Sequence, residues 1–402
     1  MGLRAKDRFN IRHGDEQSTD CRACKSDIQQ TIDINSKLKV AIVIPTKNRS
    51  DFLIRQLNYY ASVNSPHPIY IADSSDQDHA DRLKETISKL DNKLNISYQP
   101  YPQNDRSGYT AFLFSLVKEK YVCFNGDDDF QVADTLTKCA DFLEKNPDYD
   151  SAGGCSVTFK TKDNKPFGGL KETHDYPRYT IESATASQRL IDFMNNYYTT
   201  MVSVSRTENI QRYWFEHNKP ENYIKDASFS DEITPCAFSL VAGKSKVIDS
   251  LGFVHQIHDH NNPLPDIYDW ITHENWHSSY IGFKNKLINE LARQDGIGKE
   301  EAERVLKIAF WSYLKIHIPK IYNEYMLSLR PKKNQEDGLS LKRKIALRFP
   351  IIKKTYRRFV RPVLGKKMQL HYEVLQPNSP YYKDFKPIMD SLTDKTQLPS
   401  QN

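Results

Sequence analysis

Short hydrophobic runs alternate with amphipathic stretches along the first part of the chain. Residues 39–44 are apolar and β-branched, which predicts a strand buried on both faces, and Pro45 is expected to end it. Ser50 and Asp51 can cap the helix that should follow, since apolar residues then recur at helical spacing. This alternation predicts an α/β fold with a mostly parallel sheet flanked by helices. The further strands, each followed by another helical pattern, are predicted at 67–75, 94–101 and 121–124.

The pattern changes in the second part of the chain. It predicts a strand at 151–160, helices around a strand within 187–216, a closing strand or hairpin at 244–262, and an aromatic-rich helical stretch at 267–329. We therefore expect four segments. They are a polar N-terminal lead-in at 1–37, a Rossmann-like α/β domain at 38–260, a C-terminal helical extension at 261–330 and a basic amphipathic tail at 331–402.

Polar residues follow three of the predicted strands. Residues 46–49 follow the first strand, 73–75 follow the second, and the aspartates at 127–129 follow the fourth. Ligands of such sheets bind at the carboxyl ends of the strands. The three polar clusters are therefore expected to lie at one ligand-binding edge.

Three consecutive aspartates repel one another unless something offsets their charge. Asp127 and Asp129 are two residues apart, so in an extended segment their side chains lean the same way, with Asp128 turned aside. Two such carboxylates suit Mg²⁺ or Mn²⁺, which would offset the repulsion and neutralise a diphosphate leaving group. An acidic turn or a helix cap is the alternative. The position after a buried strand, in line with two other polar strand ends, favours the metal site.

These segments resemble a known family when they are taken in order. The series "VAIVIPTKNRSDFLIRQL", "IYIADSS" and "SGYTAFLFSLVKEKYVCFNGDDDF" is similar to the family 2-type glycosyltransferases of GT-A fold, over roughly residues 38–260. Two features depart from the family pattern. The second strand ends with one acid fewer, and the family's Gly-rich segment before the metal motif is reduced to 106–109.

The resemblance implies roles for individual residues. Asp73 resembles the residue that contacts the base or ribose, although it could instead cap the helix that follows. Arg49 could likewise be only an ion-pair partner of Asp51. Arg106, in the reduced Gly-rich segment, is a further candidate for donor binding. The remaining implied roles are a nucleotide-base pocket lined by Pro45, Thr46 and Arg49, and a metal and sugar-nucleotide diphosphate site at Asp127 and Asp129.

The resemblance also implies a general base downstream of the metal motif. Asp231 and Glu232 occupy the family's place for the acid that deprotonates the acceptor hydroxyl, and Asp231 is the preferred one of the two. An N-cap and a favourable first-turn acid are the structural alternatives. His258 is expected to be a third metal ligand, with a surface histidine cluster as the alternative.

The formal charge of +6 arises from one part of the chain, because basic residues concentrate at 330–367 among aliphatic and aromatic ones. Such a segment suits an anionic membrane surface, and a solvated basic face is the alternative. No motif supports a nucleic-acid partner. Among the six cysteines, Cys21 and Cys24 form a lone CxxC that is expected to be inert. Without a secretory h-region or an apolar run long enough to cross a bilayer, we expect a cytoplasmic protein, peripheral at the inner face of the membrane.

Together these features predict a metal-dependent, inverting glycosyltransferase. It would move a sugar from a nucleotide-diphosphate donor to a hydroxyl of a surface-glycan or lipid-linked acceptor, with residues 261–330 shaping the acceptor side. One alternative is a nucleotidyltransferase of sugar phosphates, although "PTKNRSDF" contains no glycine for a phosphate loop. The other is a catalytically inactive module that binds a glycan or a membrane.

Overall fold

The computed structural model describes residues 38–101, 106–217, 224–259, 267–329 and 369–393. The chain divides into two units, Met1–Leu38 and Lys39–Asn402, and the fold below is that of the second unit. The lead-in at 1–37 with its two cysteines, and the basic segment at 331–367, lie outside the described residues. The domain boundaries drawn from the sequence stay predictions.

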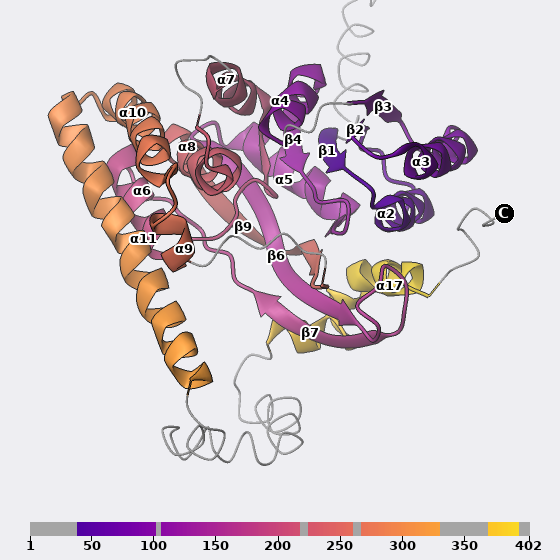
Figure 1. The fold of residues 1–402 in the computed structure, drawn as a ribbon. Helices are drawn as coiled ribbons and strands as arrows, with labels where there is room; N and C mark the ends of the chain where they lie inside the picture. Colours follow the sequence, from indigo (N-terminus) through magenta and orange to yellow (C-terminus); the bar gives the residue numbers. More distant parts are fainter. Residues whose placement is uncertain (1–37, 102–105, 218–223, 260–266, 330–368, 394–402) are drawn as a thin grey trace, which may run out of the picture. The chain divides into compact units, whose positions relative to one another are not determined.

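A nine-stranded sheet forms the centre of the second unit (Figure 1). Its first half is parallel, in the order β3-β2-β1-β4, and its second half mixes parallel and antiparallel pairs in the order β8-β6-β9-β5, with β7 beside β6. This confirms the predicted α/β class. The strands are β1 (Val40–Thr46), β2 (Ile69–Asp73), β3 (Ile96–Pro100), β4 (Tyr121–Phe124), β5 (Phe130–Gln131), β6 (Tyr149–Thr161), β7 (Leu170–Tyr176), β8 (Val204–Arg206) and β9 (Lys244–Gln256).

Helices follow the strands as the alternating pattern predicts. The helices that connect the strands of the sheet are α2 (Ser50–Ser62), α3 (Gln77–Leu90), α4 (Arg106–Leu116), α5 (Ala133–Lys145), α6 (Ala186–Asn195), α7 (Thr207–His217), the π-helix η2 (Ser228–Ile233) and α8 (Thr234–Ala242). The C-terminal helices are α9 (Ile267–Ile271), α10 (Trp276–Asp295), α11 (Lys299–Ser328), α16 (Leu370–Glu373) and α17 (Tyr382–Ser391).

Among the described residues, two apolar clusters hold these layers together. One joins the face of β1 that presents Ala41 and Val43 to α4 and α7 and includes Trp214. Val40 to Ile44 are all fully buried, as the sequence predicts for a central parallel strand. The other cluster joins α6 and α8 to α10 and α11 and includes the buried rings of Phe229 and Phe283. The aromatic-rich helical extension is thus packed on the α/β domain.

Two details at the start of the fold differ from expectation. Pro45 lies within β1 rather than ending it. Since β4 pairs with β1 only as far as Val43, no strand stands beside Pro45 on that side, and its missing N–H interrupts no ladder. The N-cap of α2 is Arg49, not Ser50 or Asp51, and Asp51 pairs with Arg82 of α3.

The sequence pattern did not predict β5, β7, α16 or α17. The last two belong to the C-terminal segment 369–393, which returns to the α/β domain. α16 packs on β7, and α17 packs on α2 with Phe385 and Ile388 fully buried. Among the residues that the structure describes, no helix is long and apolar enough to span a bilayer.

Candidate functional site

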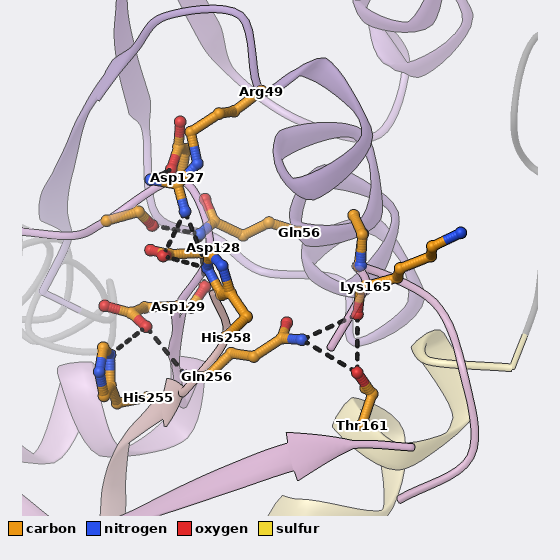
Figure 2. A network of polar contacts seen from close by, with 12 residues as sticks. Arg49, Gln56, Asp127, Asp128, Asp129, Thr161, Lys165, His255, Gln256 and His258 are labelled. Atoms are coloured by element: carbon orange, nitrogen blue, oxygen red, sulfur yellow. Dashed lines mark hydrogen bonds and ion pairs between the residues drawn. The ribbon is translucent and has the colours of Figure 1, made fainter. Parts of the chain in front are cut away.

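The ends of β1 and β4 place polar side chains next to one another (Figure 2). The Thr46 hydroxyl donates to Oδ2 of Asp127 at 2.8 Å, and Nη1 of Arg49 lies 2.9 Å from Oδ1 of the same carboxylate. The other guanidinium nitrogen, Nη2, forms an ion pair with Asp128. Arg49 therefore bridges two neighbouring aspartates, and its predicted alternative role as a partner of Asp51 is wrong, since Asp51 pairs with Arg82.

Asp128 is not turned aside as the alternation of an extended strand predicts. The N–H of Asp129 donates to the carbonyl of Gly126 at 3.3 Å, so the aspartates occupy a turn in which the two-residue alternation does not apply. All three aspartates are buried. A Cβ placed on Gly126 would lie 2.7 Å from Oδ1 of Asp128, so a larger residue there would push the Asp128 carboxylate out of its place.

The end of β9 brings two histidines to the aspartates. Nδ1 of His255 lies 2.7 Å from Oδ1 of Asp129, and the backbone N–H of Gln256 donates to that oxygen at 3.2 Å. Nε2 of His258 lies 2.8 Å from Oδ2 of Asp128 and 2.9 Å from Arg49, with its ring stacked on Phe52 at 4.5 Å. His258, the predicted third metal ligand, thus faces Asp128, and His255 is the histidine that contacts Asp129.

Two polar residues of α2, Gln56 and Arg55, donate hydrogen bonds to the backbone of the aspartate turn. Nε2 of Gln56 donates to the carbonyls of Gly126, at 2.7 Å, and of Asp129. The fully buried guanidinium of Arg55 donates to the carbonyl of Asp128 at 2.8 Å and to Oε1 of Gln256. Neither residue was predicted from the sequence. The available signal was two adjacent polar residues inside a helix whose neighbours are apolar and buried.

The charges in this cluster shift one another's pKa values. Burial raises the pKa of Asp127 to about 7 even though Arg49 opposes the shift, and burial also raises the pKa of Asp129. Against its own burial, the hydrogen bond from His258 and the charge of Arg49 hold the pKa of Asp128 below its usual range. Although burial acts against it, the charge of Asp129 raises the pKa of His255 to about 9, so His255 is a cation at neutral pH. Arg49 and His255 thereby offset much of the negative charge.

The turn after β1 is joined to the turn after β2 through Asn48. Asn48 has a φ of 54°, in the left-handed region that asparagine tolerates better than most residues. Its N–H donates to Ser75 Oγ at 2.7 Å, and its side chain exchanges hydrogen bonds of 2.8 Å with Asp76. These contacts fix the direction in which Thr46 and Arg49 leave β1.

Asp73 ends β2 directly beside Thr46 in the parallel ladder. Its Oδ2 accepts from the Tyr98 hydroxyl at 2.7 Å, and its Oδ1 accepts from the N–H of Ser75 at 2.8 Å. The residue that caps α3 is Asp76, so Asp73 is not the helix cap. Arg106 is the first residue of α4, and its side chain lies outside the described part of the chain.

Asp231 and Glu232 lie in η2, which directly precedes α8, and their side chains have different hydrogen-bond partners. The N-caps of η2 and α8 are Ala227 and Ile233, so neither acid is a helix cap, while Asp231 does lie in the first turn of η2. Asp231 accepts from the neighbouring Ser230 hydroxyl. Oε1 of Glu232 accepts from the hydroxyls of Tyr197 at 3.1 Å and Thr199 at 3.2 Å.

Tyr176 of β7 lies beside the aspartate cluster, with its ring 6.0 Å from the ring of His255. Burial raises the pKa of Tyr176, against the hydrogen bond with Thr199 and the charge of Arg178. Burial also raises the pKa of Glu232, against the hydrogen bonds from Tyr197 and Thr199.

The oxygen donors of the cluster are of the kind that Mg²⁺ and Mn²⁺ prefer. Oδ1 of Asp129 accepts two hydrogen bonds, while its Oδ2 has no hydrogen-bond partner among the described residues. Within the same residues, no group of three or more His, Cys, Asp and Glu side chains is arranged to hold a metal ion. Both oxygens of Asp127 are engaged, Oδ2 by the Thr46 hydroxyl and Oδ1 by Arg49, so Oδ2 of Asp129 is the carboxylate oxygen of these two residues that is open to a further ligand.

No protein-family model and no curated protein matches the chain. Among solved structures, residues 1–349 of Staphylococcus aureus TarS in complex with UDP-GlcNAc are 13% identical, with a TM-score of 0.46, over 88% of this chain and 89% of that one. A longer TarS structure is 15% identical, with a TM-score of 0.44, over 76% of this chain and 46% of that one. The mannosyltransferase PcManGT from Pyrobaculum calidifontis, in complex with GDP-Man and Mn²⁺, is 11% identical, with a TM-score of 0.39, over 89% of this chain and 86% of that one.

Proposed function

We propose that the protein is a metal-dependent glycosyltransferase that uses a nucleotide-diphosphate sugar as donor. One observation carries the proposal: Thr46, Arg49 and the three aspartates converge at the carboxyl edge of the parallel strands. That edge is where open α/β sheets bind their ligands. A buried set of carboxylates beside a guanidinium suits a diphosphate that arrives with a divalent cation.

The donor would lie across the ends of β1, β2 and β4. Asp73 and the turn around Thr46 would contact the nucleoside, and Arg49 would exchange its aspartate partners for phosphate oxygens. Asp127 and Asp129 would hold Mn²⁺ or Mg²⁺, with His258 as a further ligand candidate. The cation would supply charge neutralisation for the departing diphosphate.

Glu232 is proposed as the general base. Its carboxylate would take the proton of an acceptor hydroxyl while that oxygen forms a bond to the anomeric carbon and the bond from that carbon to the diphosphate oxygen breaks. Attack from the side opposite the diphosphate inverts the anomeric configuration. A raised pKa makes Glu232 a better proton acceptor than an exposed carboxylate, provided that it is ionised. Asp231 stays a candidate from the sequence, and it accepts from the Ser230 hydroxyl.

The acceptor would be a glycan or a lipid-linked sugar. The helical region α9–α11, which packs beside η2, would form the part of the site that binds the acceptor. The basic segment 331–367 would hold the protein at the anionic inner face of the membrane, at about 1 kcal/mol per basic residue near the surface. This part of the proposal is supported by the sequence of the tail and by its cationic character.

The nature of the product tests the proposal. The full chain is incubated with Mn²⁺ and each of the common nucleotide sugars, with and without glycan acceptors, and the nucleotide products are separated by chromatography. The proposal expects slow release of a nucleoside diphosphate from one donor, accelerated by a suitable acceptor. Pyrophosphate-dependent formation of a nucleoside triphosphate would instead identify a nucleotidyltransferase. No turnover of any donor, with the chain folded and Mn²⁺ present, would contradict an active enzyme.

A further inference from the structure

The long helix α11 changes its surroundings halfway along its length. Its first half packs on α6 and α10 through buried residues such as Leu306, Ala309 and Phe310. From Ile318 to Leu329, every side chain that the structure describes is exposed. Figure 1 shows this part of α11 continuing beyond α6 and α10. The second half of the helix is therefore not covered by the described part of its own chain.

Seven exposed residues of α11 follow a heptad pattern, which we call the α11 seam, while the exposed Ile316 and Met326 lie outside it. Successive members are separated by three, four, three, four, three and four residues, the spacing of coiled-coil a and d positions. Six of the seven are apolar or aromatic, with exposed fractions between 39% and 68%. The seam consists of Ile308, Trp311, Lys315, Ile318, Tyr322, Tyr325 and Leu329.

We propose that the α11 seam is a self-association surface, where α11 pairs with α11 of a second copy of this chain. A narrow stripe with a 3.5-residue period over three heptads is typical of helix–helix pairing, whereas a helix that faces a broad core presents a wider apolar face. A second copy offers the same period and the same residues, as a two-fold symmetric contact requires. This inference does not depend on the proposed transferase activity.

The composition of the seam favours a protein partner over a lipid surface. Trp, Tyr, Ile and Leu with little charge are typical of the buried core of a protein interface. The cations next to the seam on the first half of α11 are already paired, Arg304 with Glu301 at 2.6 Å and Lys307 with Glu303 at 3.2 Å. Lys315 is the one charged member of the seam, and a single lysine at an a position commonly selects register and partner number in coiled coils.

The area of the seam is close to the area that a stable dimer buries. Because large aromatic side chains present roughly 150–250 Å² each, the exposed fractions of the seam and of Met326 beside it correspond to on the order of 700 Å² per copy. A stable interface buries about 800 Å² per partner.

The second half of α11 also needs packing against a partner to be stable as a helix. Isolated helical segments shorter than about 12–15 residues are marginal in water. Pro319 removes one backbone hydrogen bond from this part of α11, which costs about 3 kcal/mol in a helix interior. Packing of the seam against a second α11 supplies the stabilisation that propensity does not.

Two isoleucines of α11 provide a matched pair of variants. Ile318 belongs to the seam and is 39% exposed, while Ile316 is 42% exposed and lies outside it. The full-length wild type, Ile318→Glu and Ile316→Glu are compared by sedimentation velocity from about 1 to about 100 µM. Wild type and Ile316→Glu are expected to form dimers, with dissociation constants within about two-fold of each other. Ile318→Glu is expected to raise the constant at least ten-fold and to sediment as the 46.7 kDa chain.

Circular dichroism and thermal melting establish that each variant is folded, and Trp311→Glu, earlier in the seam, repeats the test if Ile318→Glu is not. Three results would overturn the proposal. The wild type could stay monomeric at the highest concentration, the two isoleucine variants could dissociate alike, or a monomeric wild type could bind phosphatidylserine vesicles through Ile318 and not Ile316. The last outcome would assign the seam to a lipid surface.

Discussion

At the scale of single residues, the negative charges of buried aspartates in the site are opposed by nearby cationic side chains. Three aspartates in one turn are held by one arginine and by two histidines that come from the far end of the sheet. Arg49 contacts two of the acids at once, so it is the residue best placed to exchange a carboxylate for a phosphate when a donor binds. Asp129 differs from its neighbours because His255, rather than Arg49, is its cationic partner.

Glu232 should determine the pH dependence of the reaction. A general base acts only when it is ionised, and burial raises the pKa of Glu232 above that of an ordinary glutamate. We therefore expect kcat to rise with pH through this raised pKa and then to level off. Glu232→Gln should lower kcat by about 100-fold or more and remove that rise.

Asp231→Asn is the matched control, because Asp231 is the adjacent acid and contacts Ser230 instead. It should keep the rise in kcat and move it to somewhat lower pH, because the charge of Asp231 adds to the raised pKa of Glu232. Measuring kcat against pH for the wild type, Glu232→Gln and Asp231→Asn shows which of the two acids is the general base. If Asp231→Asn lost the rise and Glu232→Gln kept it, the base would be Asp231, as the sequence alone favours.

At the scale of elements, the turn after β1 controls how the site residues leave the sheet. Asn48→Ala would place an alanine at a φ of 54° and remove the side-chain hydrogen bonds to Asp76, so we expect a loss of roughly 1–2 kcal/mol in stability. It should also raise the KM for the donor several-fold.

Asn64→Ala serves as the control for Asn48→Ala. Asn64 has a similar φ of 49°, at the end of α2, and contacts none of the site residues. It should lose comparable stability from the strained backbone while the donor KM stays unchanged. Equal effects of the two variants on KM would contradict a role of Asn48 in positioning Thr46 and Arg49.

The C-terminal helix α17 should contribute as much stability as a core element. Phe385 is fully buried against α2, the helix that supplies Arg55 and Gln56 to the site. Phe385→Ala should lower the free energy of unfolding by about 3 kcal/mol, measured by urea denaturation. The exposed neighbour Lys383→Ala should change it by less than about 0.5 kcal/mol. A small effect of Phe385→Ala would mean that α17 is only loosely attached in solution.

At the scale of the whole molecule, the sheet and half of the site follow from the sequence. Thr46, Arg49 and Asp127 could be predicted to meet because parallel strands end at one edge, and the structure brings them together. The choice of histidine could not be predicted, since His255 and His258 have the same chemistry and the course of the chain beyond β9 decides which acid each one reaches. Arg55 and Gln56 were missed because the helical pattern of α2 does not show that the Asp127–Asp129 turn lies above them.

The C-terminal part was the hardest to foresee. α17 returns to α2 after a long basic stretch, and no local pattern in α17 specifies so distant a partner. β7 was missed for a related reason, since its residues alternate weakly and its pairing with β6 depends on the tertiary context.

The central claim is that Asp129 helps to hold a divalent cation together with a nucleotide-diphosphate sugar. The most direct measurement is isothermal titration of nucleotide sugars into the full chain, with and without Mn²⁺, for the wild type, Asp129→Asn and Asp134→Asn. Asp134 is an exposed aspartate of α5 and controls for the loss of one charge. We expect Mn²⁺-dependent binding that Asp129→Asn weakens at least ten-fold and Asp134→Asn leaves unchanged. Binding that needs no metal, or that survives in Asp129→Asn, would contradict it.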